Sequence, residues 1–149
     1  MIGCASDERE TTNSNTLKPH IIEEDEHLLI DVGAGIIVAP KDYKHIPGKG
    51  IDTKIGEIIS GDGKIAIRYD IGAMAGNYAS SIDSNKIIER KIYNTNNYIA
   101  TMVLCNDDKR KGLCVTYEKP CRMNFIASIT DDSQIQAVLN IALSIMPYK

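Results

Sequence analysis

Residues 57–72, Glu-Ile-Ile-Ser-Gly-Asp-Gly-Lys-Ile-Ala-Ile-Arg-Tyr-Asp-Ile-Gly, contain the clearest structural signal in the chain. Asp62-Gly63 separates two apolar runs, which is typical of a tight hairpin turn with positive φ. In the second run the odd-numbered residues from Ile65 to Ile71 are apolar or aromatic, so they share one face of a strand. The stretch therefore predicts a β-hairpin with one buried face and one solvent-facing face.

The hairpin is flanked on both sides by further strand candidates. Residues 43–50 predict a loop, because Pro47 and two glycines interrupt them. The residues after 72 begin with a small-residue loop, and the candidates that follow it are separated by polar turns, which predicts an antiparallel meander. The strand candidates outside the hairpin are residues 28–32, 36–39, 86–93, 98–105, 112–118 and 122–129.

One helix is predicted at the end of the chain, over residues 132–146, with an apolar stripe along one side. Asp131 can cap it together with Gln134, and Pro147 ends it. We therefore expect one α+β domain over residues 19–149. Its core is an antiparallel sheet of about six or seven strands, with the C-terminal helix packed on one face.

The composition excludes several classes of protein. The formal net charge of the 149 residues is −3, and no long cluster of Lys and Arg is present, which argues against nucleic-acid binding. No apolar run is long enough to span a bilayer. The glycines at 33 and 35 and at 48 and 50 lack the remaining residues of a phosphate-binding loop, and His20 and His27 stand in no metal-binding motif. We expect no cofactor and no metal site.

The first residues resemble the lipobox of bacterial lipoproteins. Ile2-Gly3-Cys4 is a short apolar sequence that ends in a small residue before a cysteine, although Met1 stands where the box usually has Leu. Residues 1–18 are polar without apolar periodicity, so they predict a flexible tether; an ordinary disordered terminus with a coincidental lipobox match is the alternative. The resemblance implies that the chain begins inside a signal peptide and that Cys4 is lipidated. It places the domain in the cell envelope, in the periplasm or at the surface, with the lipid as its only membrane contact.

The remaining cysteines are Cys105, Cys114 and Cys121. Their spacing fits no zinc ribbon. In an oxidising envelope we expect a disulfide between Cys105 and Cys114 across a hairpin, and one free thiol. Three half-buried thiols in a reducing compartment are the alternative.

The best candidates for ligand contacts lie at the end of the hairpin and in the loop after it: Arg68, Asp70, Asn77 and Tyr78. Glycines at 72 and 76 allow a partner to approach the backbone, and binding residues often lie on loops. The alternative is that these side chains only cover the edge of the sheet.

The order of elements also resembles small secreted bacterial proteins with a PsbP-like α/β sandwich. Gly48–Asp52, Tyr69–Gly72 and the final Ser144-Ile145 carry this resemblance. It implies a binding or accessory role, so we expect a non-catalytic envelope lipoprotein with a protein or small-molecule ligand. The alternatives are a hydrolase that uses a cysteine or His45, an inhibitor or immunity protein that binds a secreted toxin, and a structural envelope component.

Overall fold

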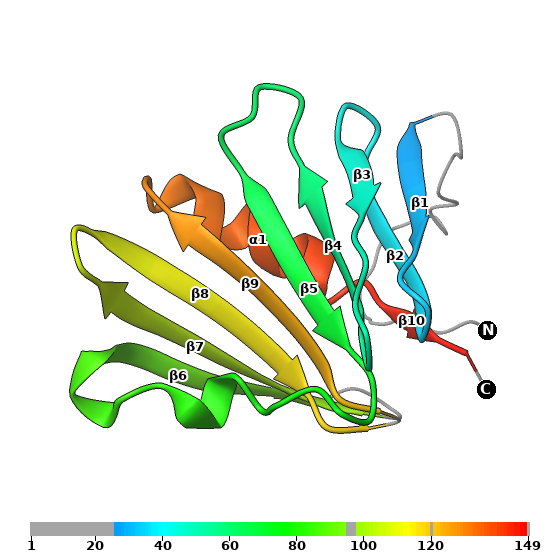
Figure 1. Ribbon diagram of the computed structural model, residues 1–149. Coiled ribbons are helices and arrows are strands. Elements are labelled where there is room, and N and C mark those ends of the chain that lie inside the picture. Colours follow the sequence, from blue (N-terminus) through cyan, green and yellow to red (C-terminus); the bar gives the residue numbers. More distant parts are fainter. Residues whose placement is uncertain (1–25, 95–97, 120, 149) are drawn as a thin grey trace.

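The computed structural model describes residues 26–94, 98–119 and 121–148 (Figure 1). Within these residues, the strands form two antiparallel sheets of seven and three strands, and there is one α-helix, α1 (Ser133–Ala142). The antiparallel α+β prediction is confirmed in this coarse form. The predicted tether and Cys4 lie outside the described residues. No helix of the described part is long and apolar enough to cross a membrane.

The large sheet is built from the predicted hairpin and meander. The meander returns to the hairpin, because its last strand, β9, pairs with β5. The sheet order is β3 (Lys44–Pro47), β4 (Lys54–Ile59), β5 (Ala66–Ile71), β9 (Met123–Ile129), β8 (Arg110–Tyr117), β7 (Ile99–Asp107) and β6 (Ile87–Asn94). Residues 72–86, here called the crossing segment, connect β5 to β6 and contain the short helices η1 (Ala79–Ser81) and η2 (Ser84–Lys86).

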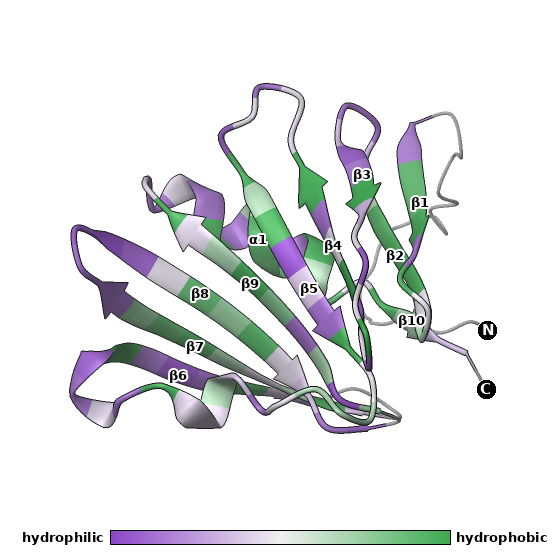
Figure 2. Cartoon of the chain, in the orientation of Figure 1, coloured by the Kyte–Doolittle hydropathy of each residue, from purple (hydrophilic) through white to green (hydrophobic). Residues whose placement is uncertain are grey.

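The two faces of the large sheet have different neighbours. The inner face packs against α1 and the small sheet, and the crossing segment runs in front of the opposite, outer face (Figure 1). Alternate residues of β5 and β9 lie on the inner face and are buried, as the alternation predicts; they are Ile67, Tyr69, Ile71, Met123, Phe125, Ala127 and Ile129. Hydrophilic residues collect at the β7–β8 hairpin tip, while the middles of these strands are hydrophobic (Figure 2).

The predicted loop at residues 43–50 is wrong in part, because Lys44–Pro47 forms the edge strand β3 beside β4. Pro47 is tolerated there since an edge strand does not need every backbone N–H for pairing. Pro47 and Gly48 end the short strand β3, but they do not prevent the strand from forming.

The first two predicted strands do not join the large sheet. β1 (His27–Asp31) and β2 (Gly35–Pro40) pair with each other, and β10 (Met146–Pro147) pairs with the other edge of β2. The predicted helix end is therefore also wrong: α1 ends at Ala142. The Ser144 hydroxyl donates to the Ile141 carbonyl at 2.7 Å and accepts from the Val38 amide at 2.9 Å, which turns the chain onto β2.

The helix begins at Ser133, one residue after the predicted start, with Asp132 at the N-cap position and the predicted Asp131 and Gln134 bonds beside it. Asp131 Oδ1 accepts a hydrogen bond from the Ser133 amide at 3.0 Å, and Gln134 Oε1 accepts one from the Asp131 amide at 3.3 Å. These reciprocal bonds satisfy backbone donors that the first helical turn leaves without partners.

A glycine on β4 makes room for a buried tyrosine on the inner face. Gly56 lies opposite Tyr69, and the Tyr69 hydroxyl reaches across it to His45 Nε2 on β3 at 2.8 Å. A Cβ atom at Gly56 would lie 2.4 Å from that hydroxyl. Because the Tyr69 ring is 3% exposed, it has no free space to move into.

We predict that Gly56→Ala destabilises the fold by about 2 kcal/mol through overpacking against Tyr69. Urea unfolding followed by circular dichroism measures the change. Gly76→Ala is the matched control, because its Cβ would meet nothing closer than 3.8 Å and should cost less than about 0.5 kcal/mol. Equal stability of the two variants would contradict the packing argument.

Candidate functional site

A row of polar side chains crosses the outer face of the large sheet. Asp70, Asn124, Thr116 and Thr101 lie opposite one another in register on β5, β9, β8 and β7. Asn124 is 0% exposed and Thr116 is 2% exposed. Buried polar side chains in a sheet need hydrogen-bond partners, and the crossing segment supplies them.

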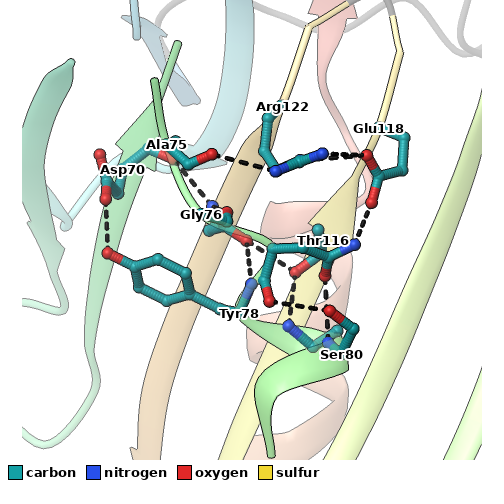
Figure 3. Close-up of polar contacts among 11 residues, drawn as sticks. Asp70, Ala75, Gly76, Tyr78, Ser80, Thr116, Glu118 and Arg122 are labelled. Carbon is teal, nitrogen blue, oxygen red and sulfur yellow. Dashed lines mark hydrogen bonds and ion pairs between the residues drawn. The ribbon is translucent and has the colours of Figure 1, made fainter. Parts of the chain in front are cut away.

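The polar row binds the backbone of the crossing segment (Figure 3). Asn124 Oδ1 accepts from the Tyr78 amide at 3.2 Å, while its Nδ2 donates to the Gly76 carbonyl at 2.8 Å. Thr116 Oγ1 accepts from the Ala79 amide at 3.2 Å and donates to Asn124 Oδ1 at 2.7 Å. The side chains of Asn124 and Thr116 thus provide the backbone of Gly76–Ala79 with the hydrogen bonds that a neighbouring strand would otherwise provide.

A second set of bonds holds the same segment at the ends of β8 and β9. Arg122 donates to the Ala75 carbonyl at 3.1 Å and to Glu118 Oε1 at 2.7 Å. The other carboxylate oxygen of Glu118 accepts from the Asn77 amide group. Asn77 in turn accepts from the Ser80 amide at 3.0 Å, which shapes the start of η1.

Asp70 and Tyr78 form the third attachment. The Tyr78 hydroxyl donates to Asp70 Oδ2, and this hydrogen bond raises the pKa of Tyr78, with burial acting in the same direction and the Arg68 charge in the opposite one. Asp70 Oδ1 is buried and finds no hydrogen-bond partner among the described residues. Asp70 therefore faces the crossing segment instead of open solvent.

The structure brings three of the four predicted ligand residues into one network. Asp70, Asn77 and Tyr78 are all engaged in holding the crossing segment, so they shape the surface more than they offer free contacts. Arg68 remains exposed on β5, between Glu57 of β4 and Ile126 of β9. On β3, Ile46 lies opposite Glu57 and is 44% exposed. We call Ile46, Glu57, Arg68 and Ile126 the open row.

The residues that organise this region, above all Asn124, Thr116 and Arg122, were not predicted from the sequence. A signal was present, because Asn124 and Thr116 alternate with the buried positions of β9 and β8. That alternation is the same for a polar side chain in solvent and for one beneath a crossing segment. Only the tertiary arrangement distinguishes the two.

Cys105, Cys114 and Cys121 are free thiols in the structure, so the disulfide predicted between Cys105 and Cys114 is not formed in it. The two residues are diagonal neighbours on the outer face, because Cys105 lies opposite Gly112 and Cys114 lies opposite Val103. Burial raises the pKa of Cys114 to about 11, and it also raises the pKa values of Cys105 and Cys121. All three thiols are held in their neutral, weakly nucleophilic form.

His45 does not meet the thiols of the outer face. Its position opposite Ile58 places it on the inner side of the sheet, whereas Cys105 and Cys114 lie on the outer side. Burial lowers the pKa of His45, and its Nε2 is engaged by the Tyr69 hydroxyl. Within the described residues, no three His, Cys, Asp or Glu side chains gather as a metal site would require.

A pocket of about 320 Å³ lies at the β4–β5 turn and the start of α1, where Asp62, Lys64 and Asp131 line it. Its carboxylates already serve the local backbone. Asp62 accepts from the Ser60 hydroxyl at 2.7 Å and the Lys64 amide at 3.0 Å, and Asp131 caps α1. The pocket therefore follows from turn and cap formation.

Compared with known proteins, the chain matches no family model and no curated protein sequence.

We predict that Asn124→Ala destabilises the protein by about 2 kcal/mol, since it leaves the Tyr78 amide and the Gly76 carbonyl without their partner. Urea unfolding measures the loss. Ser128→Ala is the control, because Ser128 lies on the same face of β9 but is exposed, and its change should stay within about 0.5 kcal/mol. A loss for Asn124→Ala no larger than the control would show that the polar row does not hold the segment.

The raised pKa of Cys114, about 11, predicts a loss of stability at alkaline pH. Below the ordinary thiol pKa of about 8.5, the Cys114 thiol is neutral in both the folded and the unfolded state, so its ionisation does not reduce the free energy of unfolding. As pH rises toward 11 the unfolded thiol ionises and the folded one does not, so unfolding becomes more favourable. When the pH is raised from about 8.5 to about 11, the free energy of unfolding should fall by about 2 kcal/mol more in the native protein than in Cys114→Ala. Chemical unfolding with a reductant present tests this, and parallel curves would contradict it.

Proposed function

We propose that this protein is a non-catalytic binding or accessory domain, lipid-anchored through Cys4 in a bacterial cell envelope, that holds a partner protein on the outer face of its large sheet. The observation that carries the binding role is the open row. It places an exposed Arg68 and an exposed Ile46 on the part of the outer face that the crossing segment leaves uncovered. The envelope location is supported by Ile2-Gly3-Cys4 and the polar residues after it.

The chemistry of the open row favours a protein partner. Ile46 at one end of the row is exposed, and Ile126 at the other end is half-buried against the cluster of Ala79, Val103 and Cys114. These apolar side chains flank an acidic and a basic residue, and such a mixture of apolar surface with charges is typical of non-obligate interfaces. The adjoining crossing segment adds Tyr78, partly exposed, and Met74, which is 72% exposed. Tyr, Met and Arg are enriched at such interfaces. The complementary surface carries an acidic group for Arg68 and a basic group for Glu57.

Rigid support is a second argument for binding. The outer face is formed by paired strands, and the crossing segment is attached to it by Asn124, Thr116 and Arg122. A surface that is ordered before binding loses less conformational entropy on association. The raised thiol pKa values and the engagement of His45 with Tyr69 support the non-catalytic reading over a hydrolase.

The two parts of the proposal are tested on one preparation, the native protein from its own cells. Its intact mass should show a diacyl or triacyl adduct on Cys4, and an unmodified Cys4 would contradict the envelope anchor alone. The binding part is then tested separately, by capture from envelope extract and culture fluid with the native protein as bait and mass spectrometry as readout.

Three baits are compared in the capture: native protein, Arg68→Glu, and Lys109→Glu, a matched charge change at the exposed β7–β8 hairpin tip. We expect a partner that native protein and Lys109→Glu retain and that Arg68→Glu loses by roughly tenfold or more. Absence of any enriched partner, or equal retention by all three baits, would contradict the proposed binding face.

A further inference from the structure

The large sheet ends in two edge strands with different properties. β3 is short and contains Pro47, two features that protect an edge from pairing with another strand. β6 spans eight residues, and six of them are exposed. It is thus the long, accessible edge, and no strand of the described residues pairs with its outward backbone groups.

The surface of β6 is apolar at both ends and charged in its middle. Ile88 is 45% exposed and Ile92 is 58% exposed, and Ile99 on the adjacent strand is 54% exposed. Between the isoleucines of β6 lie Glu89, Arg90 and Lys91. Among the described residues, neither Glu89 nor Arg90 makes an ion pair.

The charged residues Glu89, Arg90 and Lys91 can form opposite-charge pairs with the same residues of a second copy when the two strands run antiparallel. If two β6 strands run antiparallel about a two-fold axis at Arg90, Glu89 of each copy faces Lys91 of the other. Ile88, which lies in the bulge between Ile87 and Glu89, comes near Ile92 of the other copy. An axis at any of these three charged residues places one pair of like charges on the axis, which is unfavourable. Only the axis at Arg90 also forms two Glu89–Lys91 pairs, whereas an axis at Glu89 or Lys91 leaves the other charged residues opposite uncharged ones. We infer that a second copy of this chain is the partner of β6, and that the two copies pair in the register centred on Arg90.

This pairing is consistent with the geometry of the sheet. Residues directly opposite in an antiparallel pair project on the same side, so the two large sheets continue into one and both open rows face the same direction. A bulge between Ile87 and Glu89 limits regular pairing to the centre of the strand. The two Arg90 side chains meet near the axis, where both are exposed and extend into solvent. We therefore expect a dimer of modest affinity.

Sedimentation velocity of the full chain over a wide concentration range, with a reductant to exclude disulfide dimers, tests the inference. Glu89→Lys places Lys opposite Lys at both symmetry-related positions and should weaken dimerisation roughly tenfold. Lys91→Glu should weaken it to a similar extent. The double variant Glu89→Lys/Lys91→Glu, which has the native net charge, should restore native dimerisation. Arg90→Gln, which removes the repulsion on the axis, should strengthen it.

Each alternative outcome overturns a defined part of the inference. A monomer at all concentrations would exclude self-pairing, and dimerisation that neither single variant weakens would place the interface elsewhere. A double variant no better than the single ones would exclude the register centred on Arg90. Circular dichroism of all variants serves as the folding control, since the substituted residues are exposed on an edge strand and should leave the fold intact.

Discussion

The backbone groups of the crossing segment need hydrogen-bond partners, and this need determines which side chains lie beneath it on the outer face. Gly76–Ala79 crosses β9 and β8 without strand pairing, and a buried peptide group with no partner costs about 1–3 kcal/mol. Asn124 meets this need because a side-chain amide offers both a donor and an acceptor, as a backbone peptide does. Thr116 extends the same arrangement to Ala79. The remaining contacts, from Arg122 and Asp70, attach the segment at its margins.

This constraint divides the outer face into a covered and an open half. Over β7, β8 and β9 the polar row is used internally, and residues that look like ligand contacts in sequence, Asp70, Asn77 and Tyr78, are parts of the attachment. Toward β3 and β4 nothing in the described chain covers the sheet, and Ile46 and Arg68 reach solvent. Our assignment of binding to the open row follows from this division.

Local signals in the sequence were sufficient for the elements that depend on short-range chemistry. The Asp-Gly turn, the alternation in β5 and β9, and the cap formed by Asp131 and Gln134 all appear in the structure. The elements that failed depend on distant pairing. β10 is two residues long and exists because Met146 meets Ile36 on β2, and β3 is a strand because β4 lies beside it. No periodicity can develop in such short segments.

The candidate site was predictable to a lesser degree for the same reason. Arg68 and Tyr78 could be selected as polar residues near flexible glycines. The residues that hold the backbone of Tyr78 and Ala79, however, come from β8 and β9, more than thirty positions later in the chain. Asn124 and Thr116 read as ordinary solvent-facing positions. Their burial is decided by where the crossing segment lies, and that is a property of the whole fold.

The most direct test of this account is amide hydrogen exchange on the native protein. The Tyr78 and Ala79 amides donate to Asn124 and Thr116, so we expect them to exchange as slowly as the paired amides in the middle of β8. Exchange of these two amides as fast as at the exposed β7–β8 hairpin tip would contradict the account. The crossing segment would then not be held on the sheet, and the division between covered and open halves would not exist.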